Sequence, residues 1–265
     1  MTRIISTHSY RGGTGKSNIT ANLAALLAQN GHRVGIIDTD IHSPGIHVLF
    51  GIEPRMVTTT LNDFLWGRCA VEEATLDVTA QALPKGAPPA GQVFLVPSSM
   101  RTGEIARILK EGYPVDLLNE GIQGLCERLD LDFLLIDTHP GVNEETLLSI
   151  AISDCLLLVL RPDHQDYQGT AVTLELARRL EVPQLLLVLN KVLSGADYGA
   201  LADQITNAFR TPVATVLPLT EDLVRLGSAG VLAAIEPQAP YVEGLRHVLA
   251  YIEAADERDL TAPSR

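Results

Sequence analysis

The sequence predicts an α/β fold, a doubly wound, mainly parallel sheet with helices on both faces. Three observations predict it. Short apolar runs alternate with segments of helical spacing, the runs over residues 33–38 and 133–137 each end in a carboxylate, and a glycine-rich loop at residues 10–17 leads from the first run into a helix-like segment. Alternating strands and helices favour parallel strands joined by right-handed crossovers. Apolar runs as short as Leu156–Leu160 cannot cross a bilayer and are typical of buried strands.

The length and charge of the chain limit its organisation. A single domain of this class is common at 265 residues, so we expect one domain over residues 1–255 and a short polar tail over residues 256–265. The formal net charge is −12, with 32 acidic and 20 basic residues. Proteins that hold nucleic acid through phosphate contacts gather Lys and Arg. We therefore expect no strong nucleic-acid binding. The net charge does not decide whether the protein has a local basic patch.

The cysteines indicate the redox compartment. Cys69, Cys126 and Cys155 are far apart, form no C-x-x-C pair and lack metal-ligand spacing. An odd count without a secretory signal is typical of reduced thiols, so we expect a cytoplasmic protein.

The first half of the chain yields its elements in order. The residues between 18 and 29 have helical spacing, and Gly31 terminates them. Prolines and glycines predict a surface loop over residues 81–91. The strands predicted here are 3–8, 33–38 and 93–96, and the helices are 18–29, a short one at 61–66, and one from Arg101.

The second half continues the alternation. Asp166 is a candidate N-cap for a helix that runs to Arg179. Leu245, Val248, Leu249 and Ile252 form the apolar stripe of a last helix. The strands predicted here are 133–137, 155–160, 185–190 and 213–217, and a further helix covers 115–129.

The glycine-rich loop has the composition of a phosphate cradle. It fits the pattern G-x-x-x-x-G-K-[ST] loosely, because Tyr10 replaces the first glycine. A flexible backbone lets successive N–H groups point at one anion, and the helix that follows adds its positive end. A lysine supplies a point charge for the phosphates, and a hydroxyl can ligate Mg²⁺. The alternative is an ordinary strand-to-helix turn. The candidate phosphate-binding residues are Gly12, Gly13, Thr14, Gly15, Lys16 and Ser17.

Carboxylates follow two of the predicted strands. Asp38 and Asp40 lie where ligands bind in open α/β sheets, although turn capping is an alternative for Asp40. Asp137 can hold Mg²⁺ through a water while the Gly141 N–H approaches a γ-phosphate. We expect His139 to be a solvent-facing or hydrogen-bonded loop residue, because phosphoryl transfer to water depends on positioning and charge stabilisation.

Polar residues also follow the later strands. The run from Arg161 to Asp166 borders the same crevice, and its functional role stays open. The amide of Asn190 can contact a base edge or serve turn chemistry alone.

Four motifs in one order resemble the deviant Walker-A ATPases of the MinD/ParA family, from about Arg3 to about Ala255. They are Arg11–Ser17, Asp38–Asp40, Ile136–Gly141 and Val188–Lys191. The resemblance implies a P-loop NTPase domain over residues 1–255 that binds ATP and Mg²⁺ and pairs with a second copy as a homodimer across two nucleotides.

The resemblance also implies roles for residues. Lys16 would hold the phosphates, Asp40 would orient the attacking water, and Gly141 would sense the γ-phosphate. Ser17, Asp38 and Asp137 would hold the metal, whereas Asn190 and the loop that contains Pro218 would contact the base. Hydrolysis, expected to be slow and stimulated by an unidentified regulatory or cargo protein, would then break the dimer.

One residue departs from the family pattern. The signature lysine, which reaches the phosphates of the partner subunit, is replaced by Arg11. Arginine keeps the charge and changes the geometry from a point to a planar fork. We hypothesise that Arg11 acts in trans as a catalytic residue beside Lys16 and Asp40, as an arginine finger does.

Three functions compete. The first is a dimeric ATP switch that positions or regulates a partner. The second is an ATPase that assists cofactor or metal insertion or small-molecule maturation. The third, motivated by Arg11, is a nucleotide-binding module without hydrolysis. The tail over residues 256–265 lacks a basic amphipathic pattern, so we expect no C-terminal membrane anchor.

Overall fold

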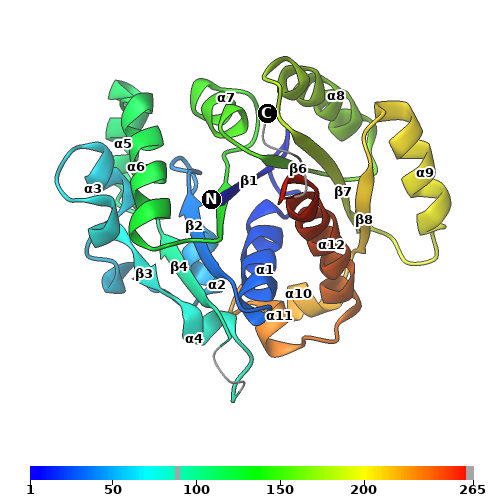
Figure 1. Ribbon diagram of the computed structural model, residues 1–265, viewed down its shortest axis with the longest axis horizontal. Helices are drawn as coiled ribbons and strands as arrows, with labels where there is room; N and C mark the ends of the chain where they lie inside the picture. The colour runs from blue at the N-terminus through cyan, green and yellow to red at the C-terminus, as the bar shows by residue number, and fades with distance from the viewer. Residues whose placement is uncertain (87–89, 261–265) are drawn as a thin grey trace.

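The computed structural model describes residues 1–86 and 90–260 and contains an eight-stranded sheet in the order β3-β4-β2-β5-β1-β6-β7-β8 (Figure 1). Every neighbouring pair is parallel except β3 and β4. The sheet confirms the predicted mainly parallel class. The strands are β1 Arg3–His8, β2 Arg33–Asp38, β3 Leu76–Asp77, β4 Gln92–Val96, β5 Phe133–Asp137, β6 Cys155–Leu160, β7 Gln184–Val192 and β8 Val213–Pro218.

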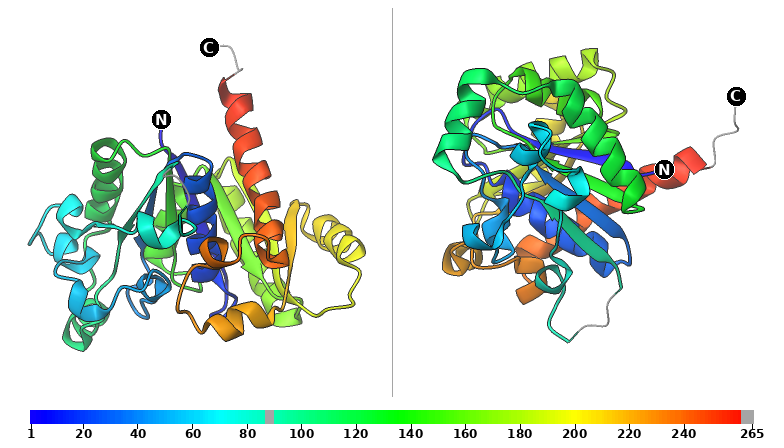
Figure 2. Two further views of the ribbon diagram at one scale, coloured as in Figure 1. Left: turned by 90° about the horizontal axis from the view of Figure 1, so that it is seen from below. Right: turned by 90° about the vertical axis from the view of Figure 1, so that its left-hand side faces the viewer.

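Helices cover both faces of the sheet. Side chains of α1 and α12 pack with one face, and side chains of α6, α7, α8 and α9 pack with the other. In the left view of Figure 2 the last turns of α12 project beyond the body of the protein. The helices are α1 Lys16–Gln29, α2 Ile46–Leu49, α3 Leu61–Leu65, α4 Thr79–Ala82, α5 Thr102–Glu111, α6 Val115–Arg128, α7 Glu144–Ala151, α8 His164–Arg179, α9 Tyr198–Phe209, α10 Glu221–Leu226, α11 Leu232–Ile235 and α12 Pro240–Leu260, with 3₁₀ turns at Pro54–Met56 and Val71–Ala74.

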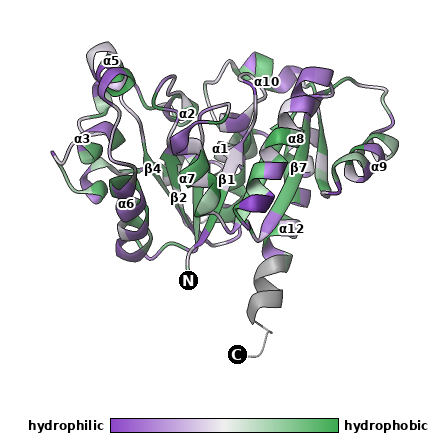
Figure 3. Ribbon diagram, turned by 90° about the horizontal axis from the view of Figure 1, so that it is seen from above, coloured by the Kyte–Doolittle hydropathy of each residue, from purple (hydrophilic) through white to green (hydrophobic). Residues whose placement is uncertain are grey.

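The core explains why the apolar runs form strands. The strands β5 and β6 are buried at every position, so their side chains meet apolar partners on both faces. Helix α1 is also buried on most of its surface, because it lies between the sheet and α12. Figure 3 shows largely hydrophobic strands in the middle of the sheet, whereas outer helices such as α6 carry both kinds of residue. Burial of this apolar area is the main favourable term for the fold.

Several boundaries differ from the sequence expectations. Strand β3 was not predicted, because its two residues give no alternation to detect. The cap of α8 is Asp163 and not Asp166, since the Asp163 carboxylate accepts the Asp166 N–H at 3.0 Å. Helix α12 continues to Leu260, inside the segment expected as a tail. The predicted loop over residues 81–91 begins inside α4, and its residues 87–89 and the tail residues 261–265 lie outside the described structure.

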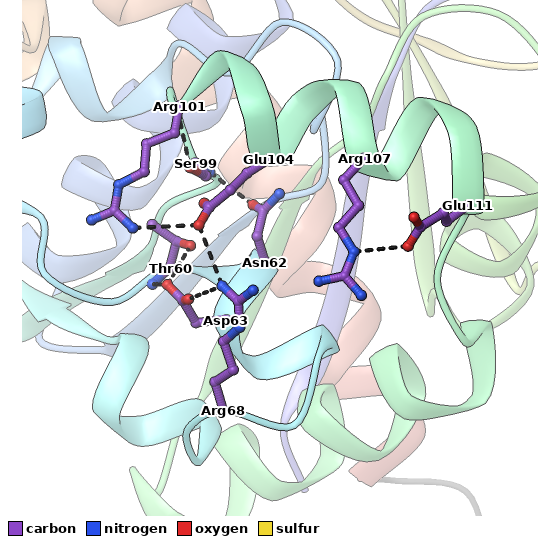
Figure 4. A network of polar contacts seen from close by, with 9 residues as sticks. All are labelled: Thr60, Asn62, Asp63, Arg68, Ser99, Arg101, Glu104, Arg107 and Glu111. Carbon is purple, nitrogen blue, oxygen red and sulfur yellow. Dashed lines mark hydrogen bonds and ion pairs between the residues drawn. The ribbon is translucent and has the colours of Figure 1, made fainter.

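A polar network ties α3 to α5 on the outer edge of the sheet (Figure 4). Arg68 bonds both Asp63 and Glu104, and the Arg68 and Arg107 guanidinium groups lie 4.6 and 4.5 Å from the Trp66 ring. These cations therefore have partners inside the chain. The mixed charge of α5 belongs to this network and to solvent.

None of the helices within residues 1–86 and 90–260 has the length and hydropathy that a membrane span requires.

Candidate functional site

The predicted site residues meet at one edge of the sheet. Strands β1, β2, β5, β6, β7 and β8 run parallel, so their carboxyl ends reach the same side. Register pairs the Asp38 and Asp137 backbones directly across β2 and β5. This edge is where ligands bind in open α/β sheets.

The phosphate loop has the conformation of an anion site. Gly13 and Gly15 have φ values of 76° and 99°, which only glycine adopts without strain. Gly15 caps α1, and no side chain accepts the first N–H groups of that helix. Lys16, at the first helical position, is only 7% exposed. Uncapped N–H groups beside a buried cation form a site that a phosphate fits.

Two residues of β7 clamp this loop. A bulge in β7 gives Lys191 a φ of 61° and directs two neighbouring side chains to the loop. Asn190 donates from Nδ2 to the Thr14 carbonyl oxygen at 2.7 Å, and Lys191 donates from Nζ to the Gly13 carbonyl oxygen at 2.7 Å. The Asn190 amide, expected at a base, therefore contacts the phosphate loop. The expected strand end at Asn190 is also extended, since β7 runs to Val192.

Two buried acids lie on adjacent strands beside Lys16. Asp38 and Asp137 are 0% and 1% exposed. Burial, with the neighbouring charges of Asp137 and Asp40, raises the pKa of Asp38 well above its ordinary value. Burial also raises the pKa of Asp137 to about 6, although a hydrogen bond from Ser17 and the charge of Lys16 act in the opposite direction.

These residues fit a magnesium ion. The Asp137 Oδ1 atom is buried without a hydrogen-bond partner, and the Ser17 hydroxyl lies within hydrogen-bond reach of the Asp137 carboxylate. Oxygen ligands of this kind suit Mg²⁺, which in nucleotide sites takes one or two protein ligands together with phosphates and waters. Among residues 1–86 and 90–260, no cluster of three His, Cys, Asp or Glu side chains has metal-binding geometry by itself.

Asp40 lies in the loop after β2 with a side chain 14% exposed. Its Oδ1 atom accepts from the Nδ1 atom of His139 at 2.8 Å, from the Ser43 N–H at 3.1 Å and from the Ser43 hydroxyl at 2.9 Å. Burial alone would raise the pKa of Asp40. The hydrogen bonds from His139 and Ser43 and the charge of Lys16 outweigh burial, so the pKa is lowered and the group is a carboxylate.

The loop after β5 brings Gly141 to the phosphate loop. The Gly141 N–H donates to the carbonyl oxygen of Ser9 at 3.1 Å, and its φ of 88° requires glycine. The N–H expected to approach a γ-phosphate is thus bonded to the chain itself in this state.

A cavity of about 180 Å³ opens beside the phosphate loop. It has apolar walls and a few polar groups, the usual construction of a small-molecule site. Its lining includes the predicted residues Gly15, Asn190 and Pro218, together with Asn18, Lys191, Leu219, Thr220, Leu223, Val224 and Tyr241.

The Arg11 guanidinium lies at the start of α8. One guanidinium nitrogen is 3.7 Å from a carboxylate oxygen of both Asp163 and Asp166, and the side chain is 41% exposed. Arg161 holds Asp166 through Nε at 3.0 Å and Nη2 at 3.3 Å. The sequence left the role of the polar run at residues 161–166 open. In the structure two of its carboxylates, Asp163 and Asp166, pair with Arg11.

Sequence reasoning missed the contacts of three residues. Lys191 is part of the motif Val188–Lys191, but the sequence gave this residue no role. His139 was given no specific partner, and Asp163 was not recognised as a cap. Their partners are distant in sequence, 178 residues for Lys191 and 99 for His139, so local patterns carry no signal for these bonds. Asp163 had a signal, because an N-cap accepts from the N–H three residues later.

Comparison with known proteins identifies the family. A family model for the CobQ/CobB/MinD/ParA nucleotide binding domain matches residues 5–233. An uncharacterised ATP-binding protein of Methanocaldococcus jannaschii is 30% identical over 237 residues, which cover 88% of this chain and 80% of the relative. An iron-sulfur cluster carrier protein of Pyrococcus furiosus is 29% identical over 188 residues, which cover 70% of this chain and 60% of that protein.

A solved structure matches the fold. The septum site-determining protein MinD of Pyrococcus horikoshii, complexed with Mg-ADP, superposes with a TM-score of 0.75 at 21% identity over 95% of this chain and 96% of that chain. This likeness confirms the predicted fold class, and the family model confirms the predicted resemblance. The chain belongs to the CobQ/CobB/MinD/ParA family of nucleotide-binding domains and is a P-loop ATPase of the MinD/ParA type.

Proposed function

We propose that this protein is an ATP-switched homodimer that positions or regulates a partner. The observation that carries the proposal is the meeting of a buried lysine, Lys16, with the carboxylates of Asp38, Asp40 and Asp137 at the edge of the sheet. A phosphate loop with one cation and two buried acids is suited to a nucleotide with its divalent ion.

In this proposal each group has a place. The N–H groups from Gly12 to Ser17, with Lys16, hold the phosphates, and the cavity beside Asn190 and Pro218 takes the base. Ser17, Asp38 and Asp137 hold Mg²⁺, which supplies charge neutralisation at the phosphates when bound. Binding of the ion lets both buried acids stay ionised, which their surroundings otherwise oppose.

Hydrolysis in this proposal depends on positioning. Asp40 is a carboxylate at neutral pH and can accept a hydrogen bond from the attacking water. Lys16 stabilises the charge of the transferred group. Gly141 exchanges its bond with Ser9 for one with the γ-phosphate, so the loop after β5 responds to the nucleotide state.

Arg11 acts in trans in the proposed dimer. To reach a second subunit it leaves Asp163 and Asp166. Both contacts are long, at 3.7 Å, and the Arg11 side chain is partly exposed although Asp166 is buried, so the contacts are weak enough to exchange. We expect Arg11→Ala to reduce ATP-dependent dimerisation and turnover at least tenfold, and Arg11→Lys to recover most of the dimer. Unchanged dimerisation and turnover in Arg11→Ala would remove Arg11 from the mechanism.

The partner is a protein in this proposal, and the location is cytoplasmic. The net charge of −12 opposes binding to phosphate backbones and anionic lipid.

The test is affinity capture with Asp40→Ala, which should bind ATP, form the dimer and fail to hydrolyse. Bait with Mg-ATP is compared with the same bait in ADP, and Lys16→Ala, which should not bind ATP, is the matched control. A partner recovered only with Asp40→Ala and ATP supports the switch. Recovery of the same proteins in every state would contradict it.

One observation favours a second function. The iron-sulfur cluster carrier similar to this chain suggests an ATPase that assists metal or cofactor insertion. Against it, Cys126 and Cys155 are buried, and Cys69 lies apart from both without a pairing motif. ATP turnover that requires ferrous iron or a small acid, and not a protein, would favour this second function. Undetectable turnover under all conditions would leave a nucleotide-binding module.

A further inference from the structure

We propose that His139 is a positioning residue that sets the Asp40 carboxylate for hydrolysis by donating its Nδ1–H to Oδ1. The inference rests on the proposed function, because it concerns how Asp40 is placed toward the water that attacks ATP. It adds a residue to which no motif of the sequence gave a role.

The hydrogen bonds divide the Asp40 carboxylate into a held oxygen and an available one. All three donors, His139 Nδ1 and the two groups of Ser43, converge on Oδ1 at 2.8 to 3.1 Å. Among the residues that the structure describes, no hydrogen bond to Asp40 Oδ2 is found. A carboxylate held by one oxygen presents the other in a fixed direction, and that oxygen can accept a water.

The direction of the proton follows from the partner. An ionised carboxylate is only an acceptor, so the Nδ1 atom of His139 must carry the hydrogen in this contact. The Nδ1–H tautomer is therefore fixed by Asp40.

The ring of His139 is itself held in place. It meets the ring of His42 edge to face at a centroid distance of 4.6 Å, and the side chain is 28% exposed. On another side it lines a small cavity with Tyr113 and Thr146, whose hydroxyl groups have no hydrogen-bond partner. A ring held by packing and by one bond keeps its donor aimed at Asp40.

His139 also joins the two loops that carry the acids. Asp40 follows β2, whereas His139 stands two residues after Asp137 and two before Gly141. The bond of 2.8 Å spans 99 residues of sequence. Gly141 and His139 lie in the same loop after β5. When Gly141 exchanges its bond with Ser9 for one with a γ-phosphate, this loop moves, and His139 in the same loop is bonded to Asp40. The bond between His139 and Asp40 thus couples the position of Asp40, which orients the water, to that of Gly141, which senses the nucleotide.

A stability role alone would leave a different signature. Both side chains are partly exposed, and ion pairs at such positions contribute little to folding. Misplacement of a reacting group by about 1 Å costs on the order of a hundredfold in rate. We therefore expect removal of the donor to affect the chemical step far more than the fold.

The experiment compares His139→Ala, His139→Asn and the wild type in steady-state ATP hydrolysis with Mg²⁺. The Asn amide places an N–H where Nδ1–H stood. We expect His139→Ala to lower kcat ten- to a hundredfold with KM and ADP affinity within twofold, and His139→Asn to recover at least half of the loss on a logarithmic scale. The control is His247→Ala, because His247 is exposed on α12.

A second readout does not use activity. In the nucleotide-free protein, the imidazole nitrogen NMR spectrum should show His139 with its proton on Nδ1, and Asp40→Ala should shift His139 toward the Nε2–H tautomer. A wild-type enzyme without turnover removes the proposed function. A wild-type enzyme that turns over, with kcat unchanged in His139→Ala or with no recovery in His139→Asn, overturns this inference alone.

Discussion

The Nζ atom of Lys191 lies 2.7 Å from the carbonyl oxygen of Gly13, so an exposed lysine at a bulge in β7 supports the phosphate loop. The bond crosses 178 residues of sequence and meets the loop one residue before the carbonyl that Asn190 holds. Two adjacent side chains therefore fix two successive carbonyls of the phosphate loop.

Lys191→Met should loosen the loop without unfolding the protein. The substitution keeps the aliphatic stem and removes one charge-assisted hydrogen bond, which at an exposed position is worth about 1 kcal/mol. Since about 1.4 kcal/mol corresponds to a tenfold change in affinity, we expect the Kd for Mg-ADP to rise about fivefold. Calorimetric titration measures it. Lys110→Met, at an exposed position of α5, is the matched control and should leave the Kd unchanged.

Gly15→Ala should abolish nucleotide binding, because the new side chain clashes with Asn190. A second substitution at Asn190 should relieve this clash. A Cβ at Gly15 would lie 2.5 Å from Asn190 Nδ2. The alanine would also have to adopt the positive φ of 99° that glycine has at this position. Gly51 is the control, because its φ is 65° and nothing lies within 4 Å of the Cβ position. We expect Gly51→Ala to cost about 1 kcal/mol of unfolding free energy from strain alone. Urea unfolding should show a larger loss in Gly15→Ala.

The contact with Asn190 gives this prediction its own check. In Gly15→Ala combined with Asn190→Ala the nearest atom is gone, so part of the stability lost by Gly15→Ala should return. A double variant as unstable as the sum of the two single variants would mean that the clash is not the cause.

The sequence predicted the frame of this site because each part of the frame is local. Apolar runs such as residues 133–137 become strands since both of their faces are buried, and parallel strands bring their carboxyl ends together without any further information. Asp38 and Asp137 were placed in this way. Gly13 and Gly15 were likewise recognisable as part of a tightly curled loop, because a backbone with positive φ favours glycine.

The remaining contacts depend on how the loops fold against one another. The partner of Arg11 was expected in a second subunit, and in the free chain its guanidinium lies beside Asp163 and Asp166. Asp166 illustrates the ambiguity of a pattern with two carboxylates three residues apart. Either can cap a helix, and the choice of Asp163 became visible only when Asp166 was found paired with Arg161.

Asp137→Asn should stabilise the nucleotide-free protein while it weakens its binding of Mg²⁺. Burial raises the pKa of Asp137 to about 6 from an ordinary value of 3.8. A folded-state pKa above the unfolded one means that the ionised group destabilises the fold at pH 7, and that this loss disappears as the pH falls from about 6 toward 4. Asn has no charge to bury. We expect an unfolding free energy higher by on the order of 2 kcal/mol at pH 7, and a difference near zero at pH 4.

Urea unfolding at the two pH values measures this difference, with the exposed Asp203→Asn in α9 as the control. Added Mg-ATP should raise the Tm of the wild type and not that of Asp137→Asn, because the variant lacks a proposed ligand. A variant less stable than the wild type at pH 7 without nucleotide would contradict the account of the buried acids.

His8 should set the acid limit of stability. His8, at the end of β1, is fully buried, and burial, assisted by the charges of Lys16 and His139, lowers its pKa to about 3. Its Nδ1 atom lies 2.7 Å from the Thr138 hydroxyl oxygen, which itself donates to Thr7, so Nδ1–H is the donor. Below pH 6.5 the unfolded chain takes up a proton that the folded chain refuses. Stability is therefore lost as the pH falls from 6.5 toward 3.

The variant His8→Asn keeps an N–H donor and removes the titration. At pH 4.5 we expect it to be more stable relative to the wild type than at pH 7.5, by on the order of 2 kcal/mol in unfolding free energy. The buried acids act in the opposite direction over the same range, and because both proteins contain them, their contribution cancels in the difference. His247→Asn, at an exposed site of α12, should show no such change. Parallel pH profiles of wild type and His8→Asn would place the acid sensitivity elsewhere.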